Sequence, residues 1–533
     1  MPPQDTVRRD LWKDAFCIVL VTLVSALPYI GRIGFYSDDW GLFADQGIHG
    51  WTGVFGNFPG RPLQALQSAL LFSAFGWRPL GYHIVTTAVI AGCGVLLYRL
   101  LVRLQAGREL SFSATLLFLL LPQLSTVRVW IAAAQVPLSL AFALASLHAQ
   151  LSFAQKGRPG ALILAAICAI LSLGLYETFT PLTAGFALTL LWKQRRDRRA
   201  IAGVATIAAL MMLAILYKVL SSGRAGEVTD VHRYLAGAAR LVSPAYDWRV
   251  DSSLNAFAAL DVYFWLTLKN WAVSLLTVAS GRSSAAAILA ASIIAALTYW
   301  RLRRTDARTF RAGRLFLLGA AAFVLGHATF LIVPSILFSP TGLANRVSVA
   351  GAIGIAMIFA AAVGCASRVV PQAFAAAMAI LAAAATLWIE RIETYWAEAP
   401  ALQRKIIENA RSDLRGLPTG SIVILDGVCP YHGPAVVFEA PWDVGGALSW
   451  ALRRTINGDT VSPRMSLKAN GLLTSIYKQP AFYRYGPTLY AYNPNLRLAV
   501  PLTSEEAARD YFGRPGRWPQ RCAPGFVGHG ALI

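Results

Sequence analysis

About eleven blocks of apolar residues, each long enough to cross a lipid bilayer as one helix, constrain the fold of this chain more than any other feature. Of its 533 residues, 56% are hydrophobic and only 14% are charged, whereas a soluble globular protein carries about 25% charged residues. Backbone polar groups must find partners within the chain inside lipid, so such blocks form helices. The sequence therefore predicts a polytopic α-helical membrane protein with spans near 13–31, 80–101, 110–126, 130–152, 159–176, 178–193, 199–220, 283–300, 314–334, 346–365 and 369–389.

The placement of the basic residues predicts how the chain threads the membrane. A net charge of +21 is also typical of nucleic-acid-binding proteins, but most Lys and Arg residues here lie in short loops between apolar blocks. Lys and Arg in such loops stay on the cytoplasmic side, so we exclude nucleic-acid binding. A cytoplasmic N-terminus places the basic clusters inside, at residues 8–13, 99–108, 156–158, 193–199, 301–314 and 368. The outer short loops then hold only Arg32, Arg61, Arg78, Arg128 and Arg346.

This threading predicts a multi-pass protein of a bacterial inner membrane, with three regions on the periplasmic side. No small-x-small cleavage site precedes Arg32, so the first apolar block is expected to stay as a helix. The outer regions are the loops 32–79 and 221–282 and the tail 390–533. Residues 262–280 are apolar enough to span, but counting them would move the tail inside. Trp265, Lys269 and Trp271 suit a helix at the membrane interface instead.

The tail differs in character from the transmembrane domain of residues 1–389. It is polar, rich in Pro and Gly, and contains the β-like run SIVILDGV (421–428), which predicts a small α/β domain for 390–533. Its cysteines are Cys429 and Cys522, and an oxidising outer compartment favours a disulfide between them. Two unpaired thiols are the alternative, because spacing alone does not show proximity. The six cysteines have no CxxC spacing that would indicate zinc.

Two adjacent carboxylates follow the first apolar block, in the run FYSDDWGLF (35–43). A carboxylate at the membrane boundary is costly unless it is solvated, paired or functional. Neighbouring carboxylates raise one another's pKa, which suits a general base. The alternative for Asp38 and Asp39 is a helix cap or turn, which Ser and Asp also favour.

The next residues resemble a known family. The runs RPL (61–63), LL (70–71) and PLGYH (79–83), the last entering a helix that ends LLVRL (100–104), resemble membrane glycosyltransferases of the GT-C superfamily. The resemblance is closest to the branch with tetratricopeptide-linked O-mannosyltransferases and their bacterial relatives. LYET (175–178) is similar to that branch's Lys-Glu-Thr/Gly motif, and PTGLANR (340–346) resembles its Glu-Arg-Tyr segment.

The resemblance covers about the first 180 residues and a patch near residue 346, but none of the tail. Three positions depart from the motifs of the branch, namely Tyr176 for Lys, Asn345 for Glu and Val347 for Tyr, and no repeat domain follows the helices. These departures bear on the sugar and the acceptor more than on the class of reaction.

The resemblance implies a GT-C-like fold and an inverting glycosyltransferase. Such an enzyme moves a hexosyl or pentosyl group from a polyprenyl-phosphate donor to a lipid, glycan or protein acceptor on the periplasmic face, with one carboxylate as base. The resemblance favours Asp39 as this base and Asp38 as the group that orients the sugar or the base. It places the donor's phosphate and sugar near Arg61, Tyr82, His83, Glu177 and Arg346.

Each of these residues also has a purely structural interpretation. Arg61 and Arg346 could snorkel at the interface, His83 could pack in the core, and Glu177 could face the helix dipole of the next helix. We expect no cofactor and no metal, because a hard cation that bridged carboxylate and phosphate would want more oxygen ligands than two adjacent acids offer.

Two other classes of protein remain as alternatives. A lipid or polysaccharide flippase or another transporter would show internal repeats and symmetrically broken helices, and the sequence shows neither. A membrane acyltransferase or phosphoethanolamine transferase would need a His-centred site or a metal-rich soluble domain. The tail could bind the acceptor glycan, cover the active site or dock a partner.

Overall fold

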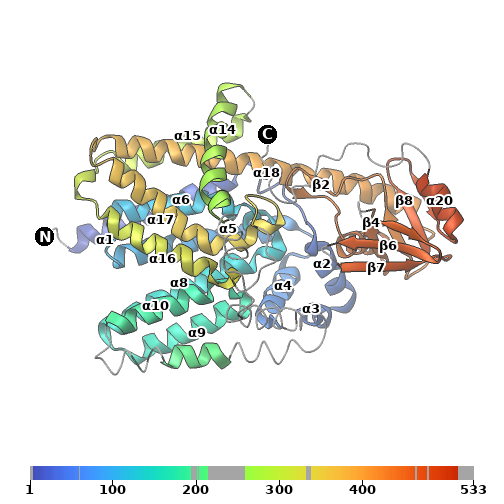
Figure 1. The fold of residues 1–533 in the computed structure, drawn as a ribbon, viewed down its shortest axis with the longest axis horizontal. Helices are drawn as coiled ribbons and strands as arrows, with labels where there is room; N and C mark the ends of the chain where they lie inside the picture. Colours follow the sequence, from blue (N-terminus) through green and yellow to red (C-terminus); the bar gives the residue numbers. More distant parts are fainter. Residues whose placement is uncertain are drawn as a thin grey trace, which may run out of the picture.

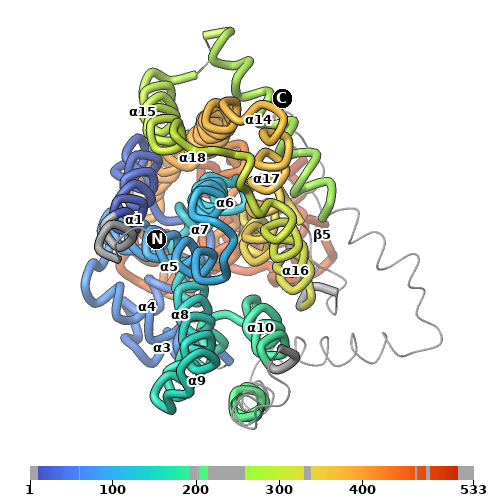
Figure 2. The backbone as a smooth tube through the Cα atoms, turned by 90° about the vertical axis from the view of Figure 1, so that its left-hand side faces the viewer, coloured from blue at the N-terminus to red at the C-terminus, as the bar shows by residue number. Residues whose placement is uncertain are grey.

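The computed structural model describes residues 4–58, 60–193, 201, 203, 205–213, 259–281, 283–331, 338–461, 465–476 and 479–513. A bundle of long helices forms one end of the molecule and a smaller part with β-sheets forms the other (Figure 1). Figure 2 shows most of the bundle helices nearly end-on. They are α1 (Gln4–Ala26), α5 (Pro79–Arg103), α6 (Arg108–Leu120), α8 (Gln135–Lys156), α9 (Pro159–Leu175), α10 (Thr180–Lys193), α15 (Ala285–Leu302), α16 (Ala312–Leu331), α17 (Val349–Ala366) and α18 (Ala373–Asp413).

Five described helical segments are long and apolar enough to cross a membrane. They are Pro79–Arg103, Ile131–Lys156, Ala285–Leu302, Leu343–Ala366 and Ala373–Asp413. The first four lie within a few residues of predicted spans, whereas the fifth begins near the predicted span 369–389 and continues well beyond its end. The pair Arg108–Leu120 and Pro122–Val129 passes the same test with a bend of 54°. Half of the predicted span 199–220 falls outside the described residues, and the total of eleven spans stays a prediction.

The apolar segment 262–280 is helical, with a π-turn at Asp261–Trp265 followed by α14 (Leu266–Ala279). This helix crosses the direction of α15 and α18 (Figure 1). Trp265 and Lys269 are exposed, whereas Asn270 and Trp271 are buried against the bundle. An amphipathic helix across the bundle agrees with the predicted interfacial element better than with a further span. Of the predicted loop 221–282, residues 221–258 lie outside the described residues.

The predicted first outer loop, residues 32–79, folds into three short helices between the bundle and the β-sheets (Figure 1), namely α2 (Asp38–His49), α3 (Trp51–Asn57) and α4 (Pro62–Phe75). Aromatic rings fill the space between these helices and the start of α5. The Phe35 ring lies 5.3–6.0 Å from the rings of Trp40, Phe43, Trp77 and Tyr82. Such edge-to-face pairs add stability beyond the area they bury.

The tail has the predicted mixed α/β structure. Its main sheet has the order β4-β1-β8-β9, where β1 (Ile422–Leu425) pairs in parallel with β4 (Asn457–Thr460) and β8 (Leu489–Asn493), and β9 (Leu498–Pro501) is antiparallel. A second sheet is the antiparallel set β5 (Ser466–Lys468), β6 (Gly471–Ile476) and β7 (Gln479–Arg484). The remaining elements are the hairpin β2 (Tyr431–His432) and β3 (Ala435–Val436), with helices α19 (Pro441–Leu452) and α20 (Glu505–Gly513).

The helix α18 joins the two parts of the molecule. Its 41 residues reach about 60 Å at 1.5 Å per residue, and it continues from the bundle into the tail (Figure 1). The predicted domain boundary between residues 389 and 390 therefore falls inside one continuous helix. Because α18 does not break there, the tail has a fixed direction relative to the bundle.

Candidate active site

The loop before the two aspartates is anchored to α18 at a proline. Pro400 lies inside α18 and has no N–H to bond the carbonyl of Trp396, one turn earlier. The Tyr36 hydroxyl donates to that carbonyl instead, and it accepts the Gly34 N–H at 3.0 Å. A Cβ at Gly34 would lie 2.7 Å from the Pro400 ring, so the loop packs directly on α18.

Ser37 follows in a backbone conformation that non-glycine residues rarely adopt, with φ +46°. Such a conformation costs of order 1–3 kcal/mol and persists only where neighbouring contacts hold it. Here the Ser37 hydroxyl donates to Glu439 of the tail at 3.0 Å, and the Tyr431 hydroxyl donates to the same carboxylate. The tail therefore helps to hold the turn that precedes the aspartates.

Asp39 is fully buried and holds backbone amides. Its two carboxylate oxygens accept the N–H of Tyr36 at 2.9 Å and the N–H of Ala132 at 2.7 Å. Burial raises the pKa of Asp39 well above its ordinary value, and the bonds from Tyr36, Ala132 and Ile131 lower it in part. The residue ties α2 to the turn Ile131–Ala133 and presents no oxygen to solvent.

Asp38 is half-buried and faces a different set of groups. Burial raises the pKa of its carboxyl, whereas the positive charge of Arg346 and the nearby polar groups of Trp442 and Ser37 lower it. Arg346 donates to the Leu343 carbonyl at 3.0 Å, and its guanidinium carbon lies 4.9 Å from the centre of the Trp130 ring. Asp38 thus meets a cation from the bundle and an indole from the tail.

The loop that carries Arg346 is shaped by its neighbour Asn345, which stands where the resembled motif has Glu. Its side-chain amide is buried and donates to the carbonyls of Ser339 and Pro340 at 3.2 and 3.0 Å. The Thr126 hydroxyl donates to the Gly342 carbonyl of the same loop at 2.6 Å. Asn345 therefore stabilises the loop through hydrogen bonds, and the charged side chain of this loop that acts on Asp38 is Arg346.

Arg61 and Glu177, both predicted to contact the donor, form an ion pair with each other at 2.6 Å. Their side chains are 28% and 21% exposed, and the Arg61 guanidinium lies 5.3 Å from the Tyr176 ring centre. The pair joins the start of α4 to the end of α9. Tyr176, where the resembled motif has Lys, supplies a ring face to Arg61 in place of a second cation.

Tyr82 and His83, the other two predicted donor contacts, are buried at the start of α5. The Tyr82 hydroxyl donates to the Gly76 carbonyl at 2.7 Å, and its ring packs on Phe35, Phe43 and Phe75. Only 1% of His83 is exposed. Both side chains pack beneath the loop that carries the aspartates, and their contact with a donor stays a prediction.

Two residues of the tail, Glu439 and Trp442, complete the surroundings of Asp38, and no sequence motif indicates them. The helix α19 begins with Pro441, which suits a first turn. Asp443 accepts the N–H groups of Glu439 and Ala440 at 2.8 and 3.0 Å, which fixes the start of the helix next to α2. Glu439 and Trp442 reach the Ser37–Asp38 turn only because α19 docks there, and the local sequence does not encode that contact.

No group of three or more His, Cys, Asp or Glu side chains that could hold a metal ion occurs within the described ranges. Cys429 is disulfide-bonded. Its predicted partner Cys522 lies outside the described residues, so the pairing itself stays a prediction.

No family model matches this chain, and no curated protein matches its sequence. Several solved structures are similar to it, among them the following two. One is ArnT from Cupriavidus metallidurans bound to undecaprenyl phosphate, with 12% identity, a TM-score of 0.38, and coverage of 84% of this chain and 85% of that one. The other is the arabinofuranosyltransferase AftD from Mycobacteria, with 14% identity, a TM-score of 0.39 and coverage of 85% of this chain. The chain spans 33% of the length of AftD.

Proposed function

We propose that this protein is a membrane glycosyltransferase of the GT-C type that moves a monosaccharide from a polyprenyl-phosphate donor to an acceptor at the outer face of a bacterial inner membrane. One observation carries the proposal. A half-buried carboxylate, Asp38, faces the cation Arg346 where the bundle meets the tail. A base beside a phosphate-binding cation is what the transfer of a sugar from a lipid phosphate needs.

Asp38 is our candidate for the base, which reverses the order that the resemblance favours. Both oxygens of Asp39 already accept backbone N–H groups, and its side chain is inaccessible. Asp38 keeps partial exposure, and burial raises its pKa toward the range where a carboxylate takes up a proton readily. Asp39 is then a positioning residue that fixes the first turn of α2.

The reaction follows as a single displacement. The acceptor hydroxyl gives its proton to the Asp38 carboxylate while its oxygen attacks the anomeric carbon of the sugar. The bond from that carbon to the phosphate oxygen breaks, and the electron pair leaves with the polyprenyl phosphate. Arg346 stabilises the phosphate as it gains charge. Arg61, held by Glu177, is the second candidate for contact with the donor.

The test compares two neighbouring substitutions in purified protein offered a panel of polyprenyl-phosphate monosaccharides. We expect Asp38→Asn to lower donor consumption by about 10²- to 10⁴-fold with an unchanged melting temperature, because only proton transfer is removed. Asp39→Asn should lower stability by about 1–3 kcal/mol, because an amide cannot accept both backbone N–H groups. Full turnover by Asp38→Asn would remove the proposed base.

The sidedness of the site has its own test. We propose that the N-terminus is cytoplasmic and that Asp38 and the tail lie in the periplasm. A single reporter cysteine at Ser504, exposed in the loop before α20, should react with a membrane-impermeant thiol reagent in intact spheroplasts. Labelling only after membrane lysis would place the tail, and with it the proposed chemistry, on the wrong side.

A further inference from the structure

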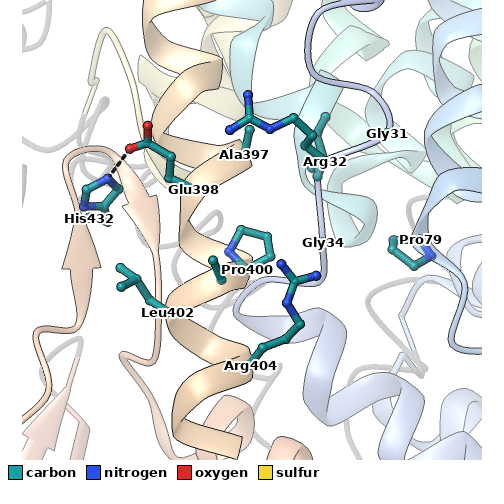
Figure 3. Close-up of a pocket in the computed structure, with 12 residues that line it drawn as sticks. Gly31, Arg32, Gly34, Pro79, Ala397, Glu398, Pro400, Leu402, Arg404 and His432 are labelled. Atoms are coloured by element: carbon teal, nitrogen blue, oxygen red, sulfur yellow. Dashed lines mark hydrogen bonds and ion pairs between the residues drawn. The ribbon is translucent and has the colours of Figure 1, made fainter.

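A cavity of about 570 Å³ opens between the first outer loop and the middle of α18 (Figure 3). Its walls are residues 31–34, Pro79 at the start of α5, residues 397–404 of α18, and His432 of the tail. Asp38 and Arg346 do not line it. The cavity is therefore distinct from the candidate active site, although both touch the same loop.

Two arginines give this cavity its charge. Arg32 and Arg404 are exposed side chains that line it, and neither has an ion-pair or hydrogen-bond partner among the residues that the structure describes. Figure 3 shows both guanidinium groups on the flank of α18 that faces Gly34 and Pro79, one on each side of Pro400. Two guanidinium groups from separate elements give this wall a positive charge that suits an oxyanion.

The carboxylate that lines the cavity, Glu398, does not neutralise these two arginines. Glu398 pairs with His432 at 2.8 Å. Figure 3 shows that pair on the other flank of α18, turned away from Arg404. The positive end of the α5 dipole at Pro79 adds to the field on the arginine side. The ligand that this wall favours is therefore an anion.

The position of the cavity indicates what bears the anion. Arg32 follows α1, and Pro79 is the first residue of a helix that meets the length and composition of a membrane span. Ala397 lies a few residues beyond the apolar stretch of α18, and Leu402 is 43% exposed beside it. Cations next to exposed apolar side chains at the end of membrane spans are placed where phosphate headgroups of lipids lie.

We propose that this cavity binds the phosphate of an anionic lipid headgroup through Arg32 and Arg404. The inference does not rest on the proposed glycosyltransferase activity. The recognised group is the phosphate, which a lipid headgroup shares with free inorganic phosphate.

The test measures binding to the full-length protein in a neutral detergent, without any sugar donor. The probes are dioctanoyl phosphatidic acid, dioctanoyl phosphatidylcholine and inorganic phosphate. We expect phosphatidic acid to bind more tightly than phosphatidylcholine, and Arg32→Gln or Arg404→Gln to weaken it by about tenfold each. Lys405→Gln removes the same charge from an exposed residue of α18 outside the cavity wall, so it should stay within about twofold of the wild type.

The arms of the experiment separate the sources of the anion. Displacement of the lipid by millimolar phosphate in the wild type shows that the phosphate group alone is sufficient, whereas no displacement assigns the site to the lipid. Arg32→Lys and Arg404→Lys keep the positive charge but lose the planar guanidinium that binds phosphate through two parallel N–H groups. These variants should bind the lipid with intermediate affinity. Equal affinity of both Arg→Gln variants and the wild type, with matching melting temperatures, would overturn the proposal. Equal binding of the two lipids would do the same.

Discussion

The contact between α19 and α2 provides the sharpest prediction, because it depends on a single glycine. A Cβ placed on Gly446 would lie 2.3 Å from the carbonyl oxygen and 2.4 Å from the carbonyl carbon of Trp40. These are backbone atoms of the helix that carries Asp38, and a backbone cannot rotate away as a side chain can. In Gly446→Ala the two helices must therefore move apart.

The size of the movement follows from the geometry. Ordinary contact of a Cβ begins at 3.4 Å, so α19 must retreat from α2 by about 1 Å. Trp442 moves with α19, away from Asp38. A displacement of about 1 Å at a catalytic group costs about 10²-fold in rate. Helix propensity alone would make alanine more stable than glycine by about 1 kcal/mol, so any loss measures the contact.

The assay is donor consumption by purified Gly446→Ala, with its melting temperature recorded in parallel. Gly486→Ala is the matched control, because it lies in the same part of the molecule with nothing within 4 Å of its added Cβ. We expect a rate lowered by about 10²-fold in Gly446→Ala and an unchanged rate in the control. Wild-type turnover by Gly446→Ala would show that the docking of α19 does not set the geometry of Asp38.

Three further predictions test individual contacts. Arg346→Gln should move the acid limb of the pH–rate profile to higher pH, because Arg346 lowers the raised pKa of Asp38 and the base works only when ionised. An unmoved limb would show that Arg346 does not act on Asp38. Arg61→Gln and Glu177→Gln should destabilise the protein about equally in denaturant titrations in detergent, with a coupling of about 1 kcal/mol in the double variant; zero coupling would mean that the ion pair does not form. Arg128→Met should lower stability by about 3–5 kcal/mol, because it removes the positive charge that acts on the buried Glu390 and Glu393 of α18 and leaves the Leu119 carbonyl without its donor. A change below about 1 kcal/mol would contradict this role.

The positions of most helices could be predicted from the sequence because their signal is local. Hydropathy over about 20 residues marks each span, and α5, α15 and α17 lie close to the predicted ranges. The continuation of α18 beyond residue 389 could not be predicted in this way. Beyond that residue the chain turns polar, and its packing depends on distant parts of the chain, as where Trp396 and Pro400 meet the loop before the aspartates.

The candidate site also has some residues that local sequence patterns predict and others that only the tertiary fold brings in. The aspartates and Arg346 could be found from short motifs, since each stands at the end of an apolar block. Trp442 and Glu439 could not be found, because they reach the site through the docking of the tail. The ion pair between Arg61 and Glu177 could not be predicted either, because these residues are 116 positions apart in the sequence.

The two aspartates show why composition alone cannot assign chemistry. They are adjacent at the start of one helix, yet successive side chains on a helix point about 100° apart. One direction leads into the bundle, where backbone amides occupy Asp39 completely. The other leads to the boundary between the bundle and the tail, where Asp38 meets Arg346 and Trp442. Without the tail, water would surround Asp38 and its pKa would return toward that of an ordinary aspartate, since burial is the main cause of the shift. The tail is therefore needed for the basicity of Asp38, even though the carboxylate itself belongs to the membrane part of the chain.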